Sequence, residues 1–221
     1  MGESWCRMTR LYDKFRPHTL TDVIGQPKAC SIAQGYIDRE LVGGHCFWLS
    51  GMSGIGKTTI ARILAESIAD PFFVTEVVGR EVSKSFLDDF ARESRLHAMG
   101  KGGRAWIVNE AHGLSKAAIE RLLDLCESLP SHVCLIFTTT RDGQEALFED
   151  QIDASPLLSR CVPIPLTNQG LAKAAAPRLR EIAQSEGLDG QPEAAYVKLM
   201  QDCKNNIRAA LQRIEAGCMK Q

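Results

Sequence analysis

The sequence lacks an excess of charge of either sign. Lysine and arginine together number 26 and aspartate and glutamate 27, so the formal net charge is −1. A chain this close to neutral has no overall attraction to the phosphates of a nucleic acid. Any contact with DNA must therefore depend on a local patch and on backbone N–H groups.

Long hydrophobic runs are also missing. No apolar stretch approaches the roughly 18 residues that a membrane-spanning helix needs, and residues 1–6 do not form the apolar core of a signal peptide. We therefore expect a soluble chain that contacts no membrane and stays inside the cell, in the cytoplasm or in a nucleoid or nucleus.

The eight cysteines include no C-x-x-C pair and do not cluster with the five histidines, which argues against a zinc module. Cys46, Cys126 and Cys134 lie inside apolar runs, where a reduced cysteine behaves as a small hydrophobic residue. A reducing compartment fits this pattern better than a secreted disulfide framework.

One motif is present in full. Residues 51–58, GMSGIGKT, match the phosphate-binding loop G-x-x-x-x-G-K-[ST] at each fixed position, between an expected strand at 46–50 and an expected helix at 59–69. Such a loop wraps phosphates with backbone N–H groups, its lysine reaches the β and γ oxygens, and its last hydroxyl can ligate Mg²⁺. We predict that a nucleoside triphosphate contacts this loop and the start of the helix: Gly51, Ser53, Gly54, Ile55, Gly56, Lys57, Thr58 and Thr59.

Beyond the loop, apolar runs alternate with amphipathic helical patterns, which indicates an α/β fold with a mostly parallel sheet flanked by helices. Ser83 and Ser115 are expected to cap two of the helices. Pro163 and Pro165 favour an edge position or an early end for the last strand. The expected strands lie at 72–78, 104–109, 132–138 and 161–165, and the expected helices between them at 83–97 and 115–129.

After residue 166 the pattern changes to helices alone, expected at 169–185, 192–202 and 205–217. We predict two domains, an α/β nucleotide-binding domain at 1–166 and a small all-helical lid at 167–221.

The end of the strand at 104–109 holds candidate catalytic residues. In hydrolases with a phosphate loop, an acidic pair stands here, one residue holding Mg²⁺ and the next acting on the attacking water. Glu110 suits the second role. Asn109 occupies the first position and brings no charge, so it would contact the metal through water, beside Thr58. Weaker metal binding or slower turnover is expected.

At this point the chain resembles the AAA+ ATPases, and among them the clamp-loader subunits of replication factor C and of the bacterial gamma/tau type. Residues 11–26, LYDKFRPHTLTDVIGQ, look like the N-terminal clamp-loader motif, and residues 159–161 look like the SRC motif. The resemblance implies that Arg160 reaches the γ-phosphate held by a neighbouring subunit. It also implies that the first motif cradles the adenine, through Tyr12, Arg16, Pro17, Val23 and Ile24.

Two further segments carry the resemblance. Residues 135–140 look like the sensor 1 strand, in which Thr139, or Thr140 one position later, would orient the attacking water. Residues 205–211, NNIRAAL, look like the start of the sensor 2 helix, from which Arg208 would contact the nucleotide. In this family DNA contacts involve helix N-termini and basic residues, for which the candidates are Ser83, Lys84, Ser115 and Lys116.

The resemblance implies an ATPase that uses ATP and Mg²⁺ to load a sliding clamp onto primer–template DNA, as one subunit of a homo- or hetero-oligomer. One alternative is another AAA+ DNA motor, such as a branch-migration helicase or helicase loader. Another is a nucleotide-gated scaffold subunit with weak hydrolysis of its own.

The departures from the family pattern also carry expectations. The sequence ends after the sensor 2 helix and does not include the collar domain of clamp loaders. Either a short form recruits a separate partner that carries a collar, or the sequence is a piece cut from a longer protein. The missing zinc module favours the replication factor C or phage-like branch. The segment at 142–155 is longer and more acidic than a minimal loop, and an interface loop is our interpretation.

Overall fold

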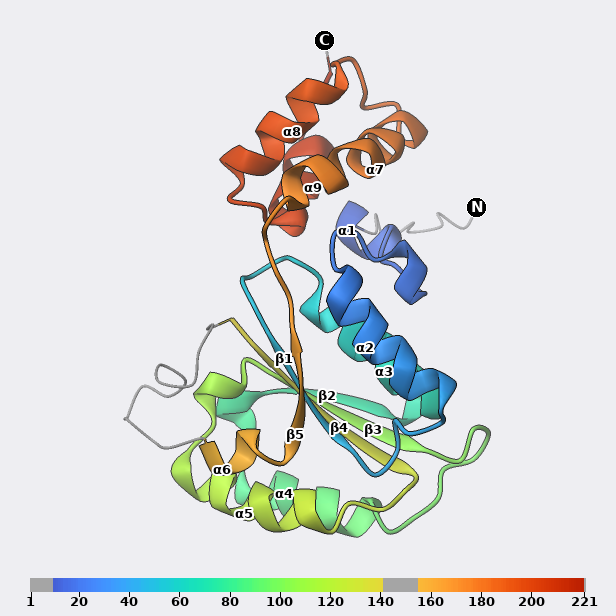
Figure 1. The fold of residues 1–221 in the computed structure, drawn as a ribbon, viewed down its shortest axis with the longest axis vertical. Helices are drawn as coiled ribbons and strands as arrows, with labels where there is room; N and C mark the ends of the chain where they lie inside the picture. Colours follow the sequence, from blue (N-terminus) through green and yellow to red (C-terminus); the bar gives the residue numbers. More distant parts are fainter. Residues whose placement is uncertain (1–9, 141–154, 221) are drawn as a thin grey trace, which may run out of the picture.

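The computed structural model describes residues 10–140 and 155–220, so the acidic segment at 142–155 lies outside the described residues apart from its last position. In the described part, one sheet of parallel strands has the order β2-β3-β4-β1-β5 (Figure 1). The expected parallel α/β sheet is confirmed, with β5 at an edge. The strands are β1 (Cys46–Ser50), β2 (Val74–Val78), β3 (Arg104–Asn109), β4 (Val133–Thr139) and β5 (Cys161–Pro165).

The central strands are apolar along nearly their whole length because helices cover both faces of the sheet. Every residue of β4 is buried. Side chains alternate between the two faces of a strand, so Phe47 and Leu49 of β1 join the hydrophobic cluster on one face, whereas Cys46 and Trp48 join the cluster on the other. This burial on both sides explains the continuous hydrophobic runs by which the strands were predicted.

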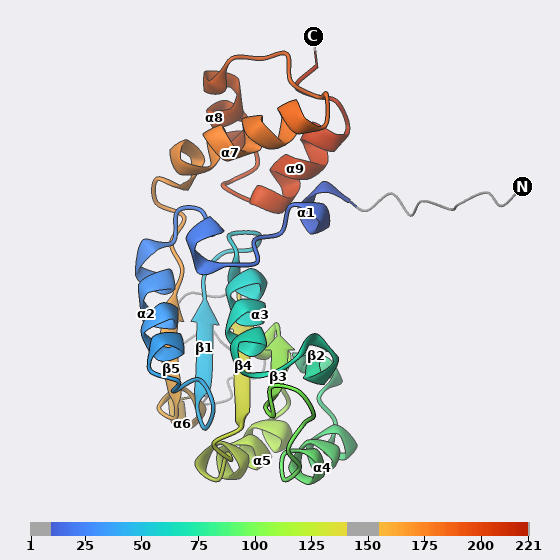
Figure 2. The ribbon, with the colours of Figure 1, turned by 90° about the vertical axis from the view of Figure 1, so that its right-hand side faces the viewer.

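Two layers of helices flank the sheet (Figures 1 and 2). The first layer contains α2 (Pro27–Asp38) and α3 (Lys57–Ile68), and the second α4 (Lys84–Glu93), α5 (Lys116–Glu127) and the short α6 (Ser155–Leu158). Short 3₁₀ turns, η1 (Leu20–Asp22), η2 (Pro71–Phe73), η3 (Gly79–Glu81) and η4 (Ala111–Gly113), connect them.

The predicted N-caps are confirmed. Ser83 accepts a hydrogen bond from the backbone N–H of Phe86 at 3.2 Å, and Ser115 accepts one from Ala118 at 3.3 Å. Each hydroxyl oxygen satisfies one backbone donor that the first helical turn leaves unpaired.

Some predicted boundaries were wrong. The strand expected from residue 72 begins at Val74, because Pro71 opens the 3₁₀ turn η2 and leaves Phe72 90% exposed. The helix expected at 83–97 ends at Glu93, and the chain then turns back, with the Ala98 N–H donating to Gly102 O at 3.0 Å. The strands expected at 46–50, 104–109 and 161–165 have the predicted bounds, and the remaining helix and strand ends lie within two residues of the prediction.

Cys46 and Cys134 are buried in the core, as predicted, whereas Cys126 is only half-buried. Complete burial raises the pKa of the Cys134 thiol well above its usual value, because a thiolate would lose its hydration there. Cys134 therefore packs as a neutral, apolar side chain.

Three helices follow β5: α7 (Leu171–Ser185), α8 (Glu193–Asp202) and α9 (Ile207–Glu215), here called the lid helices. The N-terminal α1 (Leu11–Lys14) packs beside α9, and Lys14 forms an ion pair with Glu186 at 2.7 Å. One hydrophobic cluster extends from α2 and α3 into the lid helices. The boundary proposed between residues 166 and 167 falls between β5 and α7, and the division into two domains stays a prediction.

Parallel strands bring their carboxyl ends to one edge of the sheet, and this edge faces the lid helices (Figure 2). In open α/β sheets the carboxyl ends are where ligands bind. Every helix within 10–140 and 155–220 is too short or too polar to cross a bilayer.

Candidate active site

The glycine-rich loop joins β1 to α3, and its shape depends on its glycines. Gly51, Gly54 and Gly56 have φ angles of 140°, 75° and 111°. Glycine alone adopts such angles without steric cost. A Cβ on Gly54 would lie 1.9 Å from Oδ1 of Asn206, so the lid segment approaches the loop backbone more closely than any side chain would allow.

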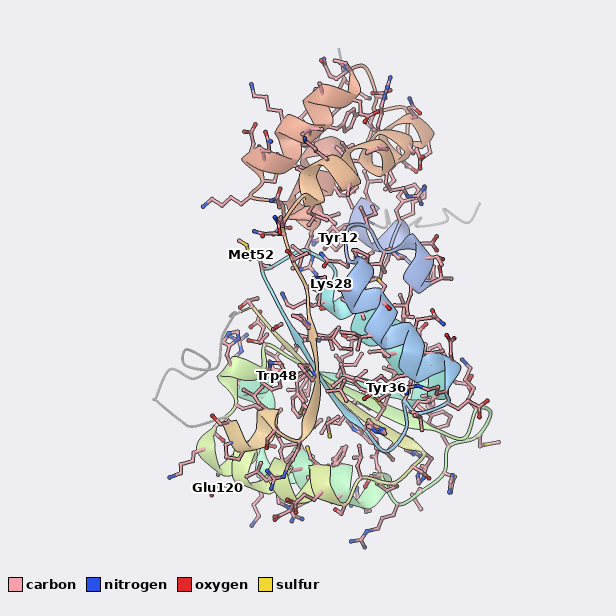
Figure 3. All side chains as sticks on the ribbon, in the orientation of Figure 1. Tyr12, Lys28, Tyr36, Trp48, Met52 and Glu120 are labelled. Carbon is pink, nitrogen blue, oxygen red and sulfur yellow. The ribbon has the colours of Figure 1, made fainter. Side chains whose placement is uncertain are left out.

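Lys57 opens α3 and is buried, with 7% of its surface exposed. Its ammonium group donates to the carbonyl oxygens of Gly51 and Met52, each at 2.6 Å. Figure 3 shows Met52 and Tyr12 between the sheet and the lid helices, whereas Trp48 lies within the sheet. The buried cation thus stands at the mouth of the loop, beside the N-terminus of α3, where an anion is favoured.

A pocket of about 580 Å³ opens at the loop, a volume usual for a small-molecule site. The loop, the N-terminal segment, the strand ends and the lid helices all contribute to its walls. Gly51 does not line it, and contributes instead the carbonyl oxygen that Lys57 binds. The other predicted nucleotide-binding residues do: Tyr12, Arg16, Pro17, Val23, Ile24, Ser53, Gly54, Ile55, Gly56, Lys57, Thr58 and Thr59.

The lid contributes more of the pocket than the sequence predicted. Arg208, the predicted lid contact, lines the pocket, and its guanidinium lies 5.5 Å from the centroid of the Tyr12 ring. Leu179 and Ile182 of α7 line it too, and no motif indicated them. The amphipathic pattern predicted that one face of α7 is buried, but not that part of this face meets the pocket.

The lid and the phosphate loop are also in direct contact. The backbone N–H of Ile207 donates to Gly54 O at 3.0 Å, while Asn206 caps α9 by accepting from the Ala209 N–H at 3.0 Å. The first turn of α9 is therefore attached to the phosphate loop.

Gln26, the last residue of the N-terminal motif, forms a second link between these parts and was not among the predicted site residues. It is 2% exposed, donates to Thr167 O at 2.7 Å and accepts from the Thr167 N–H at 3.0 Å. Its amide nitrogen also lies 3.4 Å from Ile55 O. One buried side chain thus connects the start of α2, the phosphate loop and the segment that enters the lid.

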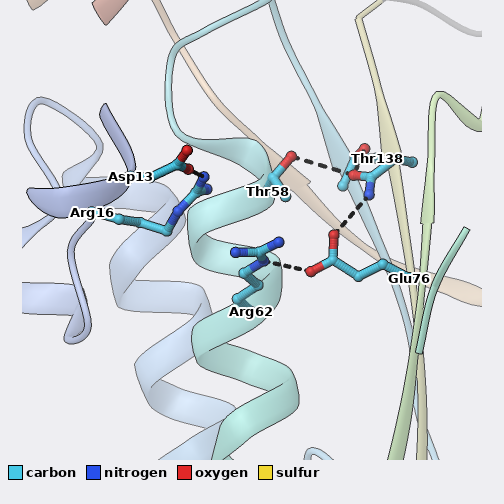
Figure 4. A network of polar contacts seen from close by, with 7 residues as sticks. Asp13, Arg16, Thr58, Arg62, Glu76 and Thr138 are labelled. Atoms are coloured by element: carbon cyan, nitrogen blue, oxygen red, sulfur yellow. Dashed lines mark hydrogen bonds and ion pairs between the residues drawn. The ribbon is translucent and has the colours of Figure 1, made fainter. Parts of the chain in front are cut away.

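Asn109, the last residue of β3, lies at the centre of a polar network. Its partners Thr58, Thr138 and Glu76 are labelled in Figure 4. Its Oδ1 accepts from the hydroxyls of Thr58 at 3.3 Å and Thr138 at 3.0 Å. Its Nδ2 donates to Oε2 of Glu76 at 3.4 Å, and Glu76 forms an ion pair with Arg62. Thr138, Glu76 and Arg62 were not predicted as site residues, because their meeting depends on how β2, β4 and α3 pack around β3.

Thr58 and Asn109 were predicted as the Mg²⁺ site, and the structure brings their side-chain oxygens together. Such neutral, hard oxygen ligands suit Mg²⁺, which usually binds proteins through few groups and shares its remaining positions with phosphates and water. Within the described residues no group of three or more His, Cys, Asp and Glu side chains could hold a metal ion. The residues fit an ion that the nucleotide phosphates hold jointly with the chain.

Glu110, the predicted catalytic base, lines the pocket in an uncommon backbone conformation. Its φ and ψ are 54° and 49°, in the left-handed region, and it is exposed. A non-glycine residue there carries strain of about 1–3 kcal/mol, and such strain concentrates at functional sites. The end of β2 packs closely against this turn, since a Cβ on Gly79 would lie 2.5 Å from Glu110 O.

Thr139 and Thr140 both line the pocket, so the choice between them as the water-orienting residue stays open. Thr139 is fully buried, and its hydroxyl lies 3.5 Å from Nδ1 of His112. Thr140 is half-buried. His112, in the turn after Glu110, is a neighbour of this site that the sequence did not indicate.

No protein-family model matches the chain. DNA polymerase III subunit gamma/tau of Mycobacterium tuberculosis is 32% identical over 155 residues, which cover 59% of this chain and 27% of that protein. The replication factor C small subunit of Halobacterium salinarum is 27% identical over 213 residues, which cover 93% of this chain and 62% of that protein. The chain therefore spans less than two thirds of the length of these relatives.

Among solved structures, the Holliday junction branch migration motor RuvB of Thermotoga maritima superposes with a TM-score of 0.66 at 24% identity, over 90% of this chain and 64% of that one. The chain has the AAA+ P-loop NTPase fold. The names of the curated relatives confirm the resemblance to AAA+ ATPases of the clamp-loader type.

Arg160, the predicted arginine finger of the AAA+ site, is not part of the pocket lining in its own chain. It is exposed, forms an ion pair with Glu127 at the end of α5, and donates to Pro156 O at 2.7 Å. A role at a neighbouring subunit stays a prediction.

The predicted DNA contacts lie at the starts of two helices on the face of the AAA+ sheet opposite α2 and α3 (Figure 1). Lys84 and Lys116 are exposed first residues of α4 and α5. The hydroxyls of Ser83 and Ser115 serve as helix caps. Capping accounts for the two serines without DNA, so their contact with DNA stays a prediction.

Proposed function

We propose that this chain is a clamp-loader-like ATPase subunit that uses ATP binding and hydrolysis to place a sliding clamp on primer–template DNA. The observation that carries the proposal is a single pocket in which the phosphate loop, Glu110, Thr139 and Arg208 meet. The likeness to gamma/tau and replication factor C small subunits supports clamp loading over other uses of ATP.

Each residue has a role that follows from its place in the pocket. Lys57 and the loop N–H groups bind the β- and γ-phosphates, and Tyr12 with its neighbours in the N-terminal segment holds the base. Glu110 takes a proton from the attacking water, which Thr139 or Thr140 orients. Arg208 reaches the phosphates from the lid. Mg²⁺, when bound beside Thr58 and Asn109, neutralises charge on the phosphate oxygens.

Arg160 completes the site of a neighbouring subunit in this proposal. A guanidinium aimed at the γ-phosphate stabilises charge that develops in the transition state, so hydrolysis would require assembly. The proposed partners are other clamp-loader subunits, one of which bears a collar domain, together with the clamp and the DNA.

Asn109 favours a second candidate function. A neutral amide where an aspartate is usual suits a nucleotide-gated scaffold subunit, which binds ATP and supplies Arg160 to its neighbour but hydrolyses slowly itself.

The steady-state ATPase rate separates these functions. It should rise only when primer–template DNA, the host's sliding clamp and the collar-bearing partner are all present. A rise with DNA alone would indicate a motor of another kind and contradict clamp loading. ATP-dependent association with no turnover under any condition would indicate the scaffold.

Glu110→Gln tests the site within the same assay. It should leave ATP affinity unchanged and lower the stimulated turnover by about 100-fold or more, the usual contribution of a general base. Glu120→Gln, on the exposed face of α5 (Figure 3), is the matched control and should change neither quantity.

A further inference from the structure

Glu76 reaches the candidate Mg²⁺ site from the edge strand β2. In the register of the sheet Val78 pairs with Asn109, so Glu76 lies two residues before that pair. Its side chain is 28% exposed and lies between Arg62 and the Asn109 amide (Figure 4). Although the proposed nucleotide contacts do not use it, Glu76 lines the pocket.

The contacts of Asn109 fix which way its amide points. Thr58 and Thr138 each place a hydroxyl on Oδ1, and Nδ2 therefore faces Glu76. The carbonyl oxygen is directed to the metal side of the network and the N–H group to a carboxylate. Asparagine can do both at once, because it carries a donor and an acceptor on one side chain.

An aspartate at position 109 would turn this contact into a repulsion. Its second oxygen would replace Nδ2, which lies 3.4 Å from Oε2 of Glu76. Two carboxylate oxygens at that separation repel each other, whereas the amide N–H of Asn109 attracts the carboxylate of Glu76. Asn109 and Glu76 therefore form a matched pair, in which an acid at one position suits a neutral group at the other.

Of the acidic residues that line the pocket within the described part of the chain, Glu76 is the one placed to supply negative charge for the ion. They are Asp22, Glu76 and Glu110. Glu110 has the proposed catalytic role, and Asp22 lies in the N-terminal turn η1. Glu76 alone of these carboxylates is hydrogen-bonded to the network that contains Thr58.

We propose that Glu76 supplies the carboxylate that the Mg²⁺ site lacks at position 109, so that the acidic charge has moved from the end of β3 to the neighbouring strand β2. Glu76 is a positioning residue, which orients Asn109 and attracts the cation and its water. The ion pair with Arg62 holds the carboxylate of Glu76 in place, and the hydrogen bond to Glu76 in turn raises the pKa of Arg62. The inference rests on the proposed ATP-dependent function.

A double-substitution cycle at Glu76 and Asn109 tests whether Glu76 takes the place of an acid at position 109. Mn²⁺ is the probe for Mg²⁺. The chain, in excess over ADP, is titrated with Mn²⁺, and the free ion is followed by electron paramagnetic resonance. Glu76→Gln should weaken Mn²⁺ binding by about 10-fold or more, as loss of an outer partner of a metal site does. ADP affinity in EDTA should stay unchanged, because that measurement excludes the cation.

Asn109→Asp should give little or no gain in Mn²⁺ affinity while Glu76 is present, and a large gain when Glu76→Gln is made as well. The double variant should therefore bind Mn²⁺ about as tightly as the wild type. Additive effects of the two substitutions, or an unchanged Mn²⁺ affinity in Glu76→Gln, would overturn the proposal.

Controls keep the test independent of folding and of the wider function. Glu93→Gln removes a surface carboxylate that does not line the pocket and that forms an ion pair of 3.6 Å with Arg104. This substitution should leave Mn²⁺ affinity unchanged. If Glu76→Gln does not fold, Glu76→Asp replaces it, and its shorter reach should also weaken Mn²⁺ binding. Coupled Mn²⁺ affinities without any clamp-dependent turnover would sink the proposed function and leave this inference standing.

Discussion

The pocket and the surface around Arg160 differ in how complete each is within one chain. The pocket draws its phosphate loop, strand ends and lid from the same polypeptide, and its polar groups bond to one another. Arg160 is exposed and bound to its own surface through Glu127. One chain therefore provides what nucleotide binding needs, while the group proposed for the transition state faces outward.

This difference separates binding from hydrolysis. Substitutions in the phosphate loop of the pocket should change the affinity of an isolated chain for nucleotide, whereas substitutions at Arg160 should change only what an assembly does. Exposed ion pairs such as Arg160–Glu127 contribute about 0–1 kcal/mol, so a neighbouring γ-phosphate can take Arg160 from Glu127 at little cost.

The largest expected effect is that of Arg160→Ala on an assembly. Turnover stimulated by DNA and clamp should fall by about 1,000-fold, the lower range for an arginine finger. Nucleotide affinity of the isolated chain should not change, as measured by equilibrium titration. Arg39→Ala, at the end of α2, is the control. A loss of affinity in the isolated Arg160→Ala chain would break the comparison, because Arg160 would then act on its own pocket.

Lys57→Ala should have the next largest effect, on the binding side. Loss of a hydrogen bond from a charged group costs about 1.5–3 kcal/mol, which is roughly a 10- to 150-fold rise in the Kd for ATP. Calorimetric titration of the isolated chain measures it, with the exposed Lys28→Ala on α2 as control. An ATP Kd that stays within twofold of the wild type would mean that the loop is not the phosphate site.

Gly54→Ala sharpens the comparison by disturbing the contact between loop and lid. The new Cβ would overlap Asn206, and overpacking of this kind costs about 1–3 kcal/mol. Gly102→Ala is a matched control, since Gly102 has a φ of 83° but no neighbour within 4 Å. Urea unfolding should show Gly54→Ala to be the less stable variant. Equal stabilities would mean that Asn206 moves away without cost.

The features that local pattern determines could be predicted from the sequence. The glycines and Lys57 of the loop need no distant partner, and β1 and β4 are apolar because both of their faces are buried. Ser83 and Ser115 cap helices through backbone groups three residues away. Such short-range interactions can be predicted from the sequence alone.

The links between distant segments could not be predicted. Gln26 meets Thr167, which is 141 positions away, and Glu76 meets Asn109 only because β2 pairs with β3 in one particular register. A shift of one residue in that register would direct Glu76 to the other face of the sheet. The replacement of an acid at position 109 was visible in the sequence, but the carboxylate that stands beside it was not.

The smallest expected effect concerns the lid, through the acid stability of Asp189. The carboxylate of Asp189 accepts hydrogen bonds from the Tyr196 hydroxyl at 2.8 Å and from the Gln184 amide at 3.0 Å. These bonds lower the pKa of Asp189 to about 2. A carboxyl group whose pKa is lower in the folded state than in the unfolded state stabilises the folded state at pH values above the unfolded-state pKa. This stabilisation is lost as the pH falls through the folded-state pKa. Asp189→Asn should therefore be less stable than the wild type near neutral pH, and the difference should shrink between about pH 4 and pH 2. Urea midpoints across that range measure it, with Asp202→Asn on α8 as the exposed control. A stability difference that does not depend on pH would show that Asp189 contributes through packing, and that the lid is insensitive to the charge on this carboxylate.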